Sequence, residues 1–103
     1  WLHASDTAEA VIKIIEAGVV NETYNISGNY EEQNLVVANK IVKLMGLKGD
    51  PAQYLDLGVK RPGQDVRYAI NDTKLKLLGW YAVADFDEEL KKIVKYYTKN
   101  FVW

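Results

Sequence analysis

The stretch VKRPGQDVRYAIN, residues 59–71, holds the side chains of this chain that are best suited to bind an anion. Arg61 stands before Pro62, and a proline ring restricts the backbone of the residue that precedes it. A guanidinium on such a stiffened loop can donate two parallel hydrogen bonds to a phosphate. Arg67 and Tyr68 add further donors close by. From these residues alone an ordinary surface loop is the favoured interpretation, and contact with an anionic small molecule is the alternative.

Other reactive side chains give weaker signals. His3 is the single histidine and lies near the start of the chain, so it is a poor candidate for a catalytic base or a metal ligand. Cysteine is absent, which excludes disulfides and thiolate chemistry, and no Cys/His cluster has zinc spacing. Neither glycine-rich phosphate loop, G-x-G-x-x-G or G-x-x-x-x-G-K-[ST], occurs. We therefore expect no metal site and no dinucleotide loop on this chain.

Composition narrows the class of protein further. The 103 residues carry a net charge of -1, with 49% hydrophobic and 26% charged residues, which is typical of one globular domain. A nucleic-acid partner is not expected, because that needs a basic face. No apolar run approaches the roughly 18 residues of a membrane helix, so no membrane contact is expected. Apolar residues at both ends suggest a piece of something longer.

Four segments have the apolar spacing of helices. In the first, Ala8, Val11, Ile12 and Ile15 share one face, which we expect to be buried. Its cap is expected from Ser5 or Asp6, and Gly18 is expected to close it in the left-handed conformation. Asp85 and Glu88 have capping-box spacing at the start of the last helix, where acidic residues favour a helix N-terminus. The predicted helices cover about residues 5–17, 34–45, 73–78 and 86–100.

Three short segments alternate apolar and polar residues and are predicted as strands. They are TYNIS (23–27), YLDLGV (54–59) and VRYAI (66–70). Asn25 lies in the first of them and offers an amide close to the glycine turn that follows. The order of elements predicts a mixed α/β (α+β) fold of about four helices with three short strands.

Several segments resemble the dTDP-glucose 4,6-dehydratases, nucleotide-sugar enzymes of the extended short-chain dehydrogenase/reductase type. RPGQDVRYAIN (61–71) is similar to that family's R-P-G-H-D-x-R-Y-A-I-D. ETYNISG (22–28) is similar to E-x-Y-N-I-G-G, and WLHASDTAEAV (1–11) to W-L-Y-V-x-D-H-A-x-A. The resemblance covers nearly the whole chain. The first motif is fairly specific, whereas the others are shared with nucleotide-sugar epimerases and decarboxylases.

The resemblance implies a cytoplasmic, usually dimeric lyase that uses tightly held NAD to convert dTDP-glucose to its 4-keto-6-deoxy form. Residues 1–103 would be its C-terminal substrate-binding domain, and the N-terminal Rossmann domain would be absent. No catalytic residue and no cofactor are then expected on this chain alone. The expected partners are a nucleotide-sugar diphosphate, the missing Rossmann domain and a second copy of the chain.

Four residues carry over from the family to substrate binding. Asn25 and Arg61 match positions that hold the diphosphate. Tyr68 matches the tyrosine of the same motif and is expected to line or support the pocket. Gln64 stands where the family usually has histidine, and glutamine can hydrogen-bond but cannot carry charge. Two alternatives stay open: a free-standing binding or oligomerisation module, and a segment of a related UDP-sugar decarboxylase or epimerase.

Overall fold

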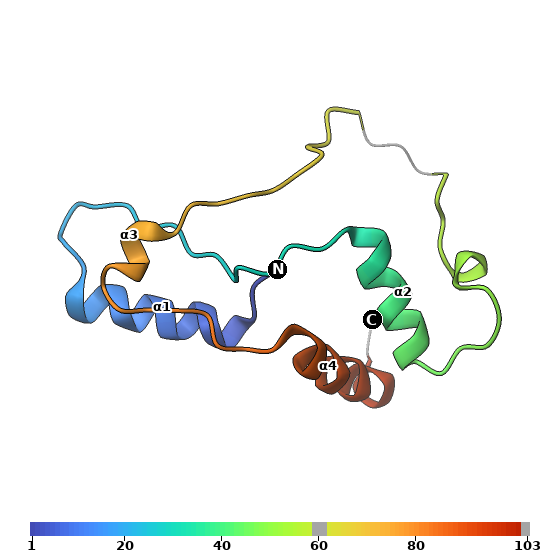
Figure 1. Ribbon diagram of the computed structural model, residues 1–103. Helices are drawn as coiled ribbons and strands as arrows, with labels where there is room; N and C mark the ends of the chain where they lie inside the picture. Colours follow the sequence, from blue (N-terminus) through green and yellow to red (C-terminus); the bar gives the residue numbers. More distant parts are fainter. Residues whose placement is uncertain (59–61, 102–103) are drawn as a thin grey trace. The chain divides into compact units, whose positions relative to one another are not determined.

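The computed structural model describes residues 1–58 and 62–101, and the regular structure in them is helical (Figure 1). The elements are α1 (Ala4–Ala17), α2 (Asn34–Leu44), the 3₁₀ helix η1 (Pro51–Tyr54), α3 (Thr73–Lys76) and α4 (Phe86–Asn100). The four α-helices lie where the sequence predicts them, although α3 is shorter than expected.

The chain divides into two compact units. The first unit comprises Trp1–Glu31 and Arg67–Phe86, and the second comprises Glu32–Val66 and Asp87–Trp103. The chain therefore leaves the first unit after Glu31 and re-enters it at Arg67. Helices α1 and α3 belong to the first unit, whereas α2, η1 and nearly all of α4 belong to the second.

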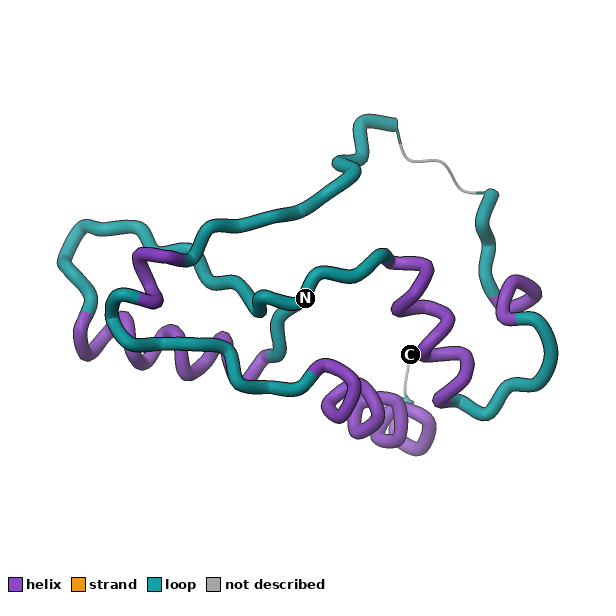
Figure 2. Tube along the Cα trace, in the orientation of Figure 1, coloured by secondary structure: helices purple, strands orange, loops and turns teal. Residues whose placement is uncertain are grey.

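The predicted mixed α/β fold is wrong, because residues 1–58 and 62–101 contain no strand (Figure 2). Residues 23–27 and 66–70 have an irregular backbone that forms no β-ladder with another described segment. Tyr54 ends η1 instead of beginning a strand. Alternation reports only which side chains point the same way, whereas a strand also needs the backbone of a neighbour. The alternate apolar side chains of 66–70 are exposed: Val66 by 104%, Tyr68 by 70% and Ile70 by 56%. They therefore do not pack against a second layer of the described structure.

The first unit is organised around a small apolar cluster. Ala10 of α1, Leu75 of α3 and Trp80 are buried together. Tyr24 and Ile26, from the predicted strand 23–27, pack against this cluster. The segment thus contributes its alternate side chains to a core without joining a sheet.

Helix α1 does not bury the face that the sequence predicts. Ala10 is fully buried and Ile14 packs on the cluster, whereas Val11, Ile12 and Ile15 are 45%, 48% and 78% exposed. Three β-branched side chains therefore remain on the exposed side of the helix. The spacing identified the helix correctly but could not say which of its two apolar faces has a partner within this chain.

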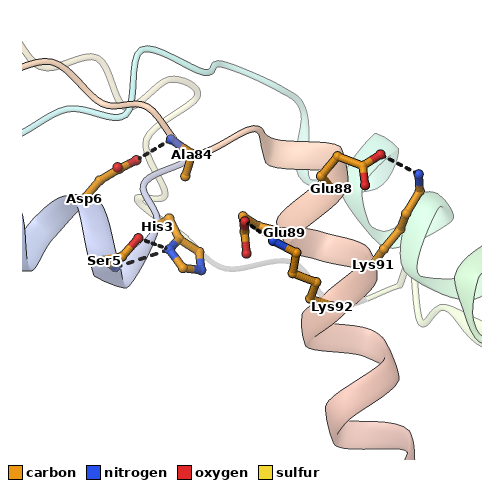
Figure 3. A network of polar contacts seen from close by, with 8 residues as sticks. All are labelled: His3, Ser5, Asp6, Ala84, Glu88, Glu89, Lys91 and Lys92. Atoms are coloured by element: carbon orange, nitrogen blue, oxygen red, sulfur yellow. Dashed lines mark hydrogen bonds and ion pairs between the residues drawn. The ribbon is translucent and has the colours of Figure 1, made fainter.

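The start of α1 is capped by His3 rather than by Ser5 or Asp6. The Ser5 backbone N–H donates to Nδ1 of His3 at 3.2 Å, and the Ser5 hydroxyl lies 2.6 Å from the same nitrogen (Figure 3). The single histidine therefore has a structural role here. At the other end, Gly18 keeps an extended backbone (φ -73°) and is not left-handed as expected.

Asp6 connects α1 to the segment after Trp80. It is 3% exposed, and its two carboxylate oxygens accept hydrogen bonds from the backbone N–H groups of Val83 and Ala84, each at 3.2 Å. Figure 3 shows the contact with Ala84. A buried carboxylate needs such donors, because burial without hydrogen bonds is costly for a charged group.

Gly28 marks a close approach of two backbones. A β-carbon at this position would lie 1.8 Å from the carbonyl oxygen of Trp1. The Trp1 amino group donates to the carbonyl of Tyr30 at 2.8 Å, so the first residues run directly past residues 28–30. Only glycine fits between them.

In the second unit, η1 packs against α2. Among the described residues of this unit, the buried apolar side chains are those of Val37, Val42 and Val94. Lys40 of α2 donates to Asp87 of α4 at 2.6 Å. The acidic first turn of α4 pairs with lysines one turn along the same helix, Glu88 with Lys91 and Glu89 with Lys92 (Figure 3). The prediction that the acidic run belongs to a helix start is confirmed.

The cluster predicts how α3 responds to truncation. Leu75→Ala should lower the free energy of unfolding by about 2–5 kcal/mol, because it leaves a cavity beside Ala10 and Trp80. Leu77→Ala, at a position that is 82% exposed, should change it by less than about 0.5 kcal/mol. Urea unfolding of the two variants measures both values. Equal losses would show that the cluster does not stabilise the first unit.

Candidate functional site

Asn25 lies in the first unit and is oriented by the segment that precedes α3. Its Nδ2 donates to the backbone carbonyl of Asn71 at 3.2 Å. Asn71 in turn contacts the start of α3, because its Oδ1 accepts a hydrogen bond from the backbone N–H of Thr73 at 2.9 Å. A side-chain amide has two N–H donors and one acceptor oxygen. Asn25 is exposed and so keeps one N–H and its oxygen for a ligand.

The other predicted site residues are distributed over the chain. Tyr68 lies in the first unit with Asn25, and its side chain is exposed. Gln64 is exposed and belongs to the second unit. Arg61 lies outside the described residues. The structure therefore brings Asn25 and Tyr68 into one unit, and the assignment of Arg61 and Gln64 to a diphosphate stays a prediction.

Arg67, expected to add donors for an anion, is paired instead. Its Nε donates to Oε1 of Glu31, and its Nη2 donates to Oε2 at 2.7 Å. Two parallel bonds to a carboxylate are the strongest geometry for such a pair. The pKa of Glu31 is lowered, chiefly by this hydrogen bonding, and the pKa of Arg67 is raised by it. Nothing local in the sequence indicated Glu31, because it is 36 residues away.

A second ion pair joins the same two segments nearer the core. Lys74 donates to Glu22, and its ammonium group lies 4.9 Å from the centre of the Tyr24 ring. Hydrogen bonding and the positive charge of Lys74 lower the pKa of Glu22. Glu22 contacts Lys74, Asn25 contacts Asn71, and Glu31 contacts Arg67. In these three contacts the partner's number falls as the residue's own number rises. Residues 22–31 and 67–74 therefore run antiparallel, and side chains hold them together.

A buried carboxylate lies at the start of α3. Asp72 is 4% exposed, and its Oδ1 lies 2.8 Å from Nζ of Lys76. The same ammonium donates to Oδ1 of Asn29 at 2.9 Å. Oδ2 of Asp72 is buried and has no hydrogen-bond partner in the part of the chain that the structure describes. The pair with Lys76 balances the buried charge, as such a position requires.

A metal site and a membrane-spanning helix each place requirements on the described part of the chain. Among residues 1–58 and 62–101, no group of three or more His, Cys, Asp or Glu side chains is placed to hold a metal ion. Within those same ranges, no helix has the length and apolarity needed to cross a membrane.

Comparison with known proteins points to one class, the nucleotide-sugar 4,6-dehydratases. The chain is 38% identical over 112 residues to the dTDP-glucose 4,6-dehydratase of Neisseria meningitidis, covering 100% of this chain and 32% of that protein. It is 42% identical over 108 residues to a probable dTDP-glucose 4,6-dehydratase of Sinorhizobium fredii, covering 100% and 31%. It is 39% identical over 103 residues to a trifunctional UDP-glucose 4,6-dehydratase, epimerase and reductase of Arabidopsis thaliana, covering 100% and 15%. No protein-family model matches the chain.

Along its whole length the chain is similar to one segment of dTDP-glucose 4,6-dehydratases, and the resemblance found in the sequence is therefore confirmed. The chain spans only 15% to 32% of the length of the relatives described above.

The nicotinamide dinucleotide implied by the resemblance does not fit the residues of this chain. The sequence contains no G-x-G-x-x-G loop. In the described ranges there is also no strand from which such a loop could lead into a helix. No residue here is therefore assigned to that cofactor.

The two ion pairs between residues 22–31 and 67–74 predict a pH dependence. Both carboxyl groups have pKa values lowered from 4.5, so their contribution to stability is present above about pH 4.5 and is lost as the pH falls through the lowered values. The wild-type chain should be more stable than Glu22→Gln/Glu31→Gln near pH 7, and this advantage should shrink near about pH 3. Urea unfolding at both pH values measures it. A constant difference would mean that the carboxylates contribute nothing through their charge.

Proposed function

We propose that this chain is the C-terminal substrate-binding part of a dTDP-glucose 4,6-dehydratase, a cytoplasmic lyase. Similarity to these dehydratases over the whole chain supports the proposal, together with the R-P-G-x-D-x-R-Y motif of residues 61–68. The observation that carries it is that the same chain contains this motif and an exposed Asn25, whose amide is oriented by a hydrogen bond. The cytoplasmic location comes from the family resemblance alone.

In this proposal, the chain holds the diphosphate of the nucleotide sugar. Arg61 donates two parallel hydrogen bonds to phosphate oxygens, and Asn25 donates the N–H that it does not use on Asn71. Gln64 contributes an uncharged donor in place of the usual histidine, so its hydrogen bond is the weaker kind. Tyr68 lines or supports the pocket with an aromatic face. These residues bind and orient the substrate and take no part in bond breaking.

The rest of the parent protein supplies the chemistry. The nicotinamide dinucleotide provides the hydride acceptor and donor of the reaction and is held outside this chain. The exposed apolar face of α1, formed by Val11, Ile12 and Ile15, is the surface that we assign to contact with the missing Rossmann domain. In isolation, the same surface favours association of the chain with itself, and the parent is proposed to be a dimer.

One alternative has an observation in its favour. A relative named as a UDP-glucose 4,6-dehydratase is about as similar to this chain as the dTDP-glucose enzymes are. The segment could therefore serve a UDP-sugar enzyme, because the residues assigned here contact phosphates and not the base. Comparing the affinities of thymidine and uridine diphosphate sugars for the intact parent distinguishes the two.

Removing the proposed phosphate ligand should weaken binding in the full-length enzyme. Arg61→Ala removes a charge-assisted hydrogen bond worth about 1.5–3 kcal/mol, so the Kd for thymidine diphosphate should rise more than tenfold. The matched control is Lys60→Ala, which removes the same charge from the neighbouring position and should have a much smaller effect. Isothermal titration calorimetry measures both. An unchanged Kd for Arg61→Ala would remove the diphosphate assignment.

The isolated chain separates the proposed segment from a free-standing module. Part of a diphosphate site should bind thymidine diphosphate with a Kd of about 1 mM or weaker, because the remaining contacts lie on the missing domain. Calorimetric titration of the 103-residue chain measures this. A micromolar Kd would favour an independent binding module.

A further inference from the structure

Glu31 and Arg67 stand at the two points where the chain leaves the first unit and returns to it. The intervening residues 32–66 include Gln64 and the proposed phosphate ligand Arg61. The bidentate contact between Glu31 and Arg67 therefore fixes the distance between the two ends of the segment that carries these residues.

The same ion pair makes Arg67 unsuitable as a direct phosphate ligand. Its Nε and Nη2 already donate to the Glu31 carboxylate. An approaching phosphate would meet the negative charge of Glu31 beside the guanidinium, and like charges at short range repel each other. Its residue type alone suggests an added donor for an anion, whereas its pairing with Glu31 suits a positioning role.

What the pair positions follows from its neighbours in the chain. Tyr68 lies between two cross-links to residues 25–31: the Glu31–Arg67 pair on one side and the Asn25–Asn71 hydrogen bond on the other. In the other direction along the chain, Gln64 comes shortly before Arg67 in the sequence. The two cross-links thus hold Asn25 and Tyr68 on facing segments that no backbone ladder joins in the described residues.

We propose that Glu31 and Arg67 are a positioning pair, which holds Tyr68 against the segment that carries Asn25. This inference rests on the proposed function, because it gives the pair a role in nucleotide binding. Neither residue touches the substrate. Both act through the placement of the residues that do.

The test uses the full-length enzyme that contains this chain. Glu31→Gln and Arg67→Gln should each raise the Kd for thymidine diphosphate and the KM for the nucleotide sugar by about two- to fivefold, because exposed ion pairs contribute modestly. The kcat should change by less than about twofold, since no reacting group is altered. Exchanging the charges, with Glu31→Arg and Arg67→Glu together, should restore the Kd toward the wild-type value.

The matched control is Glu88→Gln, which removes the similarly exposed pair with Lys91 on α4 and should leave the Kd unchanged. The inference is overturned if both single variants bind as the wild type does. It is also overturned if Arg67→Gln loses more than about tenfold while Glu31→Gln loses nothing and the charge exchange fails, because Arg67 would then bind phosphate directly.

Amide hydrogen exchange separates this inference from the proposed function. In the positioning account, exchange of residues 67–71 is faster in Glu31→Gln than in Glu88→Gln, with or without nucleotide. A wild-type enzyme that binds no thymidine diphosphate would refute the proposed function. The pair would then be judged by exchange alone, and equal exchange in the two variants would refute it.

Discussion

Contacts between side chains, and not a backbone ladder, hold residues 22–31 against residues 67–74 in the described structure, and the candidate site depends on this. Glu22 pairs with Lys74, the Asn25 amide reaches the Asn71 carbonyl, and Glu31 pairs with Arg67. Each contact alone is exposed and contributes little. In series, they fix the register of two segments that would otherwise be free to slide.

The two ends of this arrangement are held with different strength. Near α3, the buried Leu75 and Trp80, with Tyr24 packed on them, add apolar burial to the contacts. Such burial is worth about 1.5–3 kcal/mol for a large side chain. Near Tyr68 and Glu31 the described contacts between these two segments are polar and exposed, and the neighbouring Tyr30 stacks on Phe86. Of the residues proposed to bind substrate, Tyr68 lies at the weakly held end, whereas Asn25 lies between Tyr24 and Ile26, which pack on the apolar cluster.

Local signals predicted the helices, and non-local contacts decided the rest. Apolar spacing located α1 and α4 within a residue or two, because helical hydrogen bonds close within four residues. The strand at 66–70 failed because alternation cannot reveal whether a partner backbone is present in the chain. The exposed face of α1 failed for the same reason, since Ile15 faces no partner here. At the site, motif similarity singled out Asn25 and Tyr68. It gave no indication that Arg67 pairs with Glu31, because Glu31 is distant in sequence.

In the proposed function, Arg61 and Asn25 of this chain bind a diphosphate while Arg67 remains paired with Glu31. A crystal structure of the full-length enzyme with thymidine diphosphate tests it most directly. The account predicts that the Arg61 guanidinium and the Asn25 amide lie about 3 Å from phosphate oxygens, with the Glu31–Arg67 pair intact. A diphosphate held by Arg67, or one that contacts neither Arg61 nor Asn25, would contradict it.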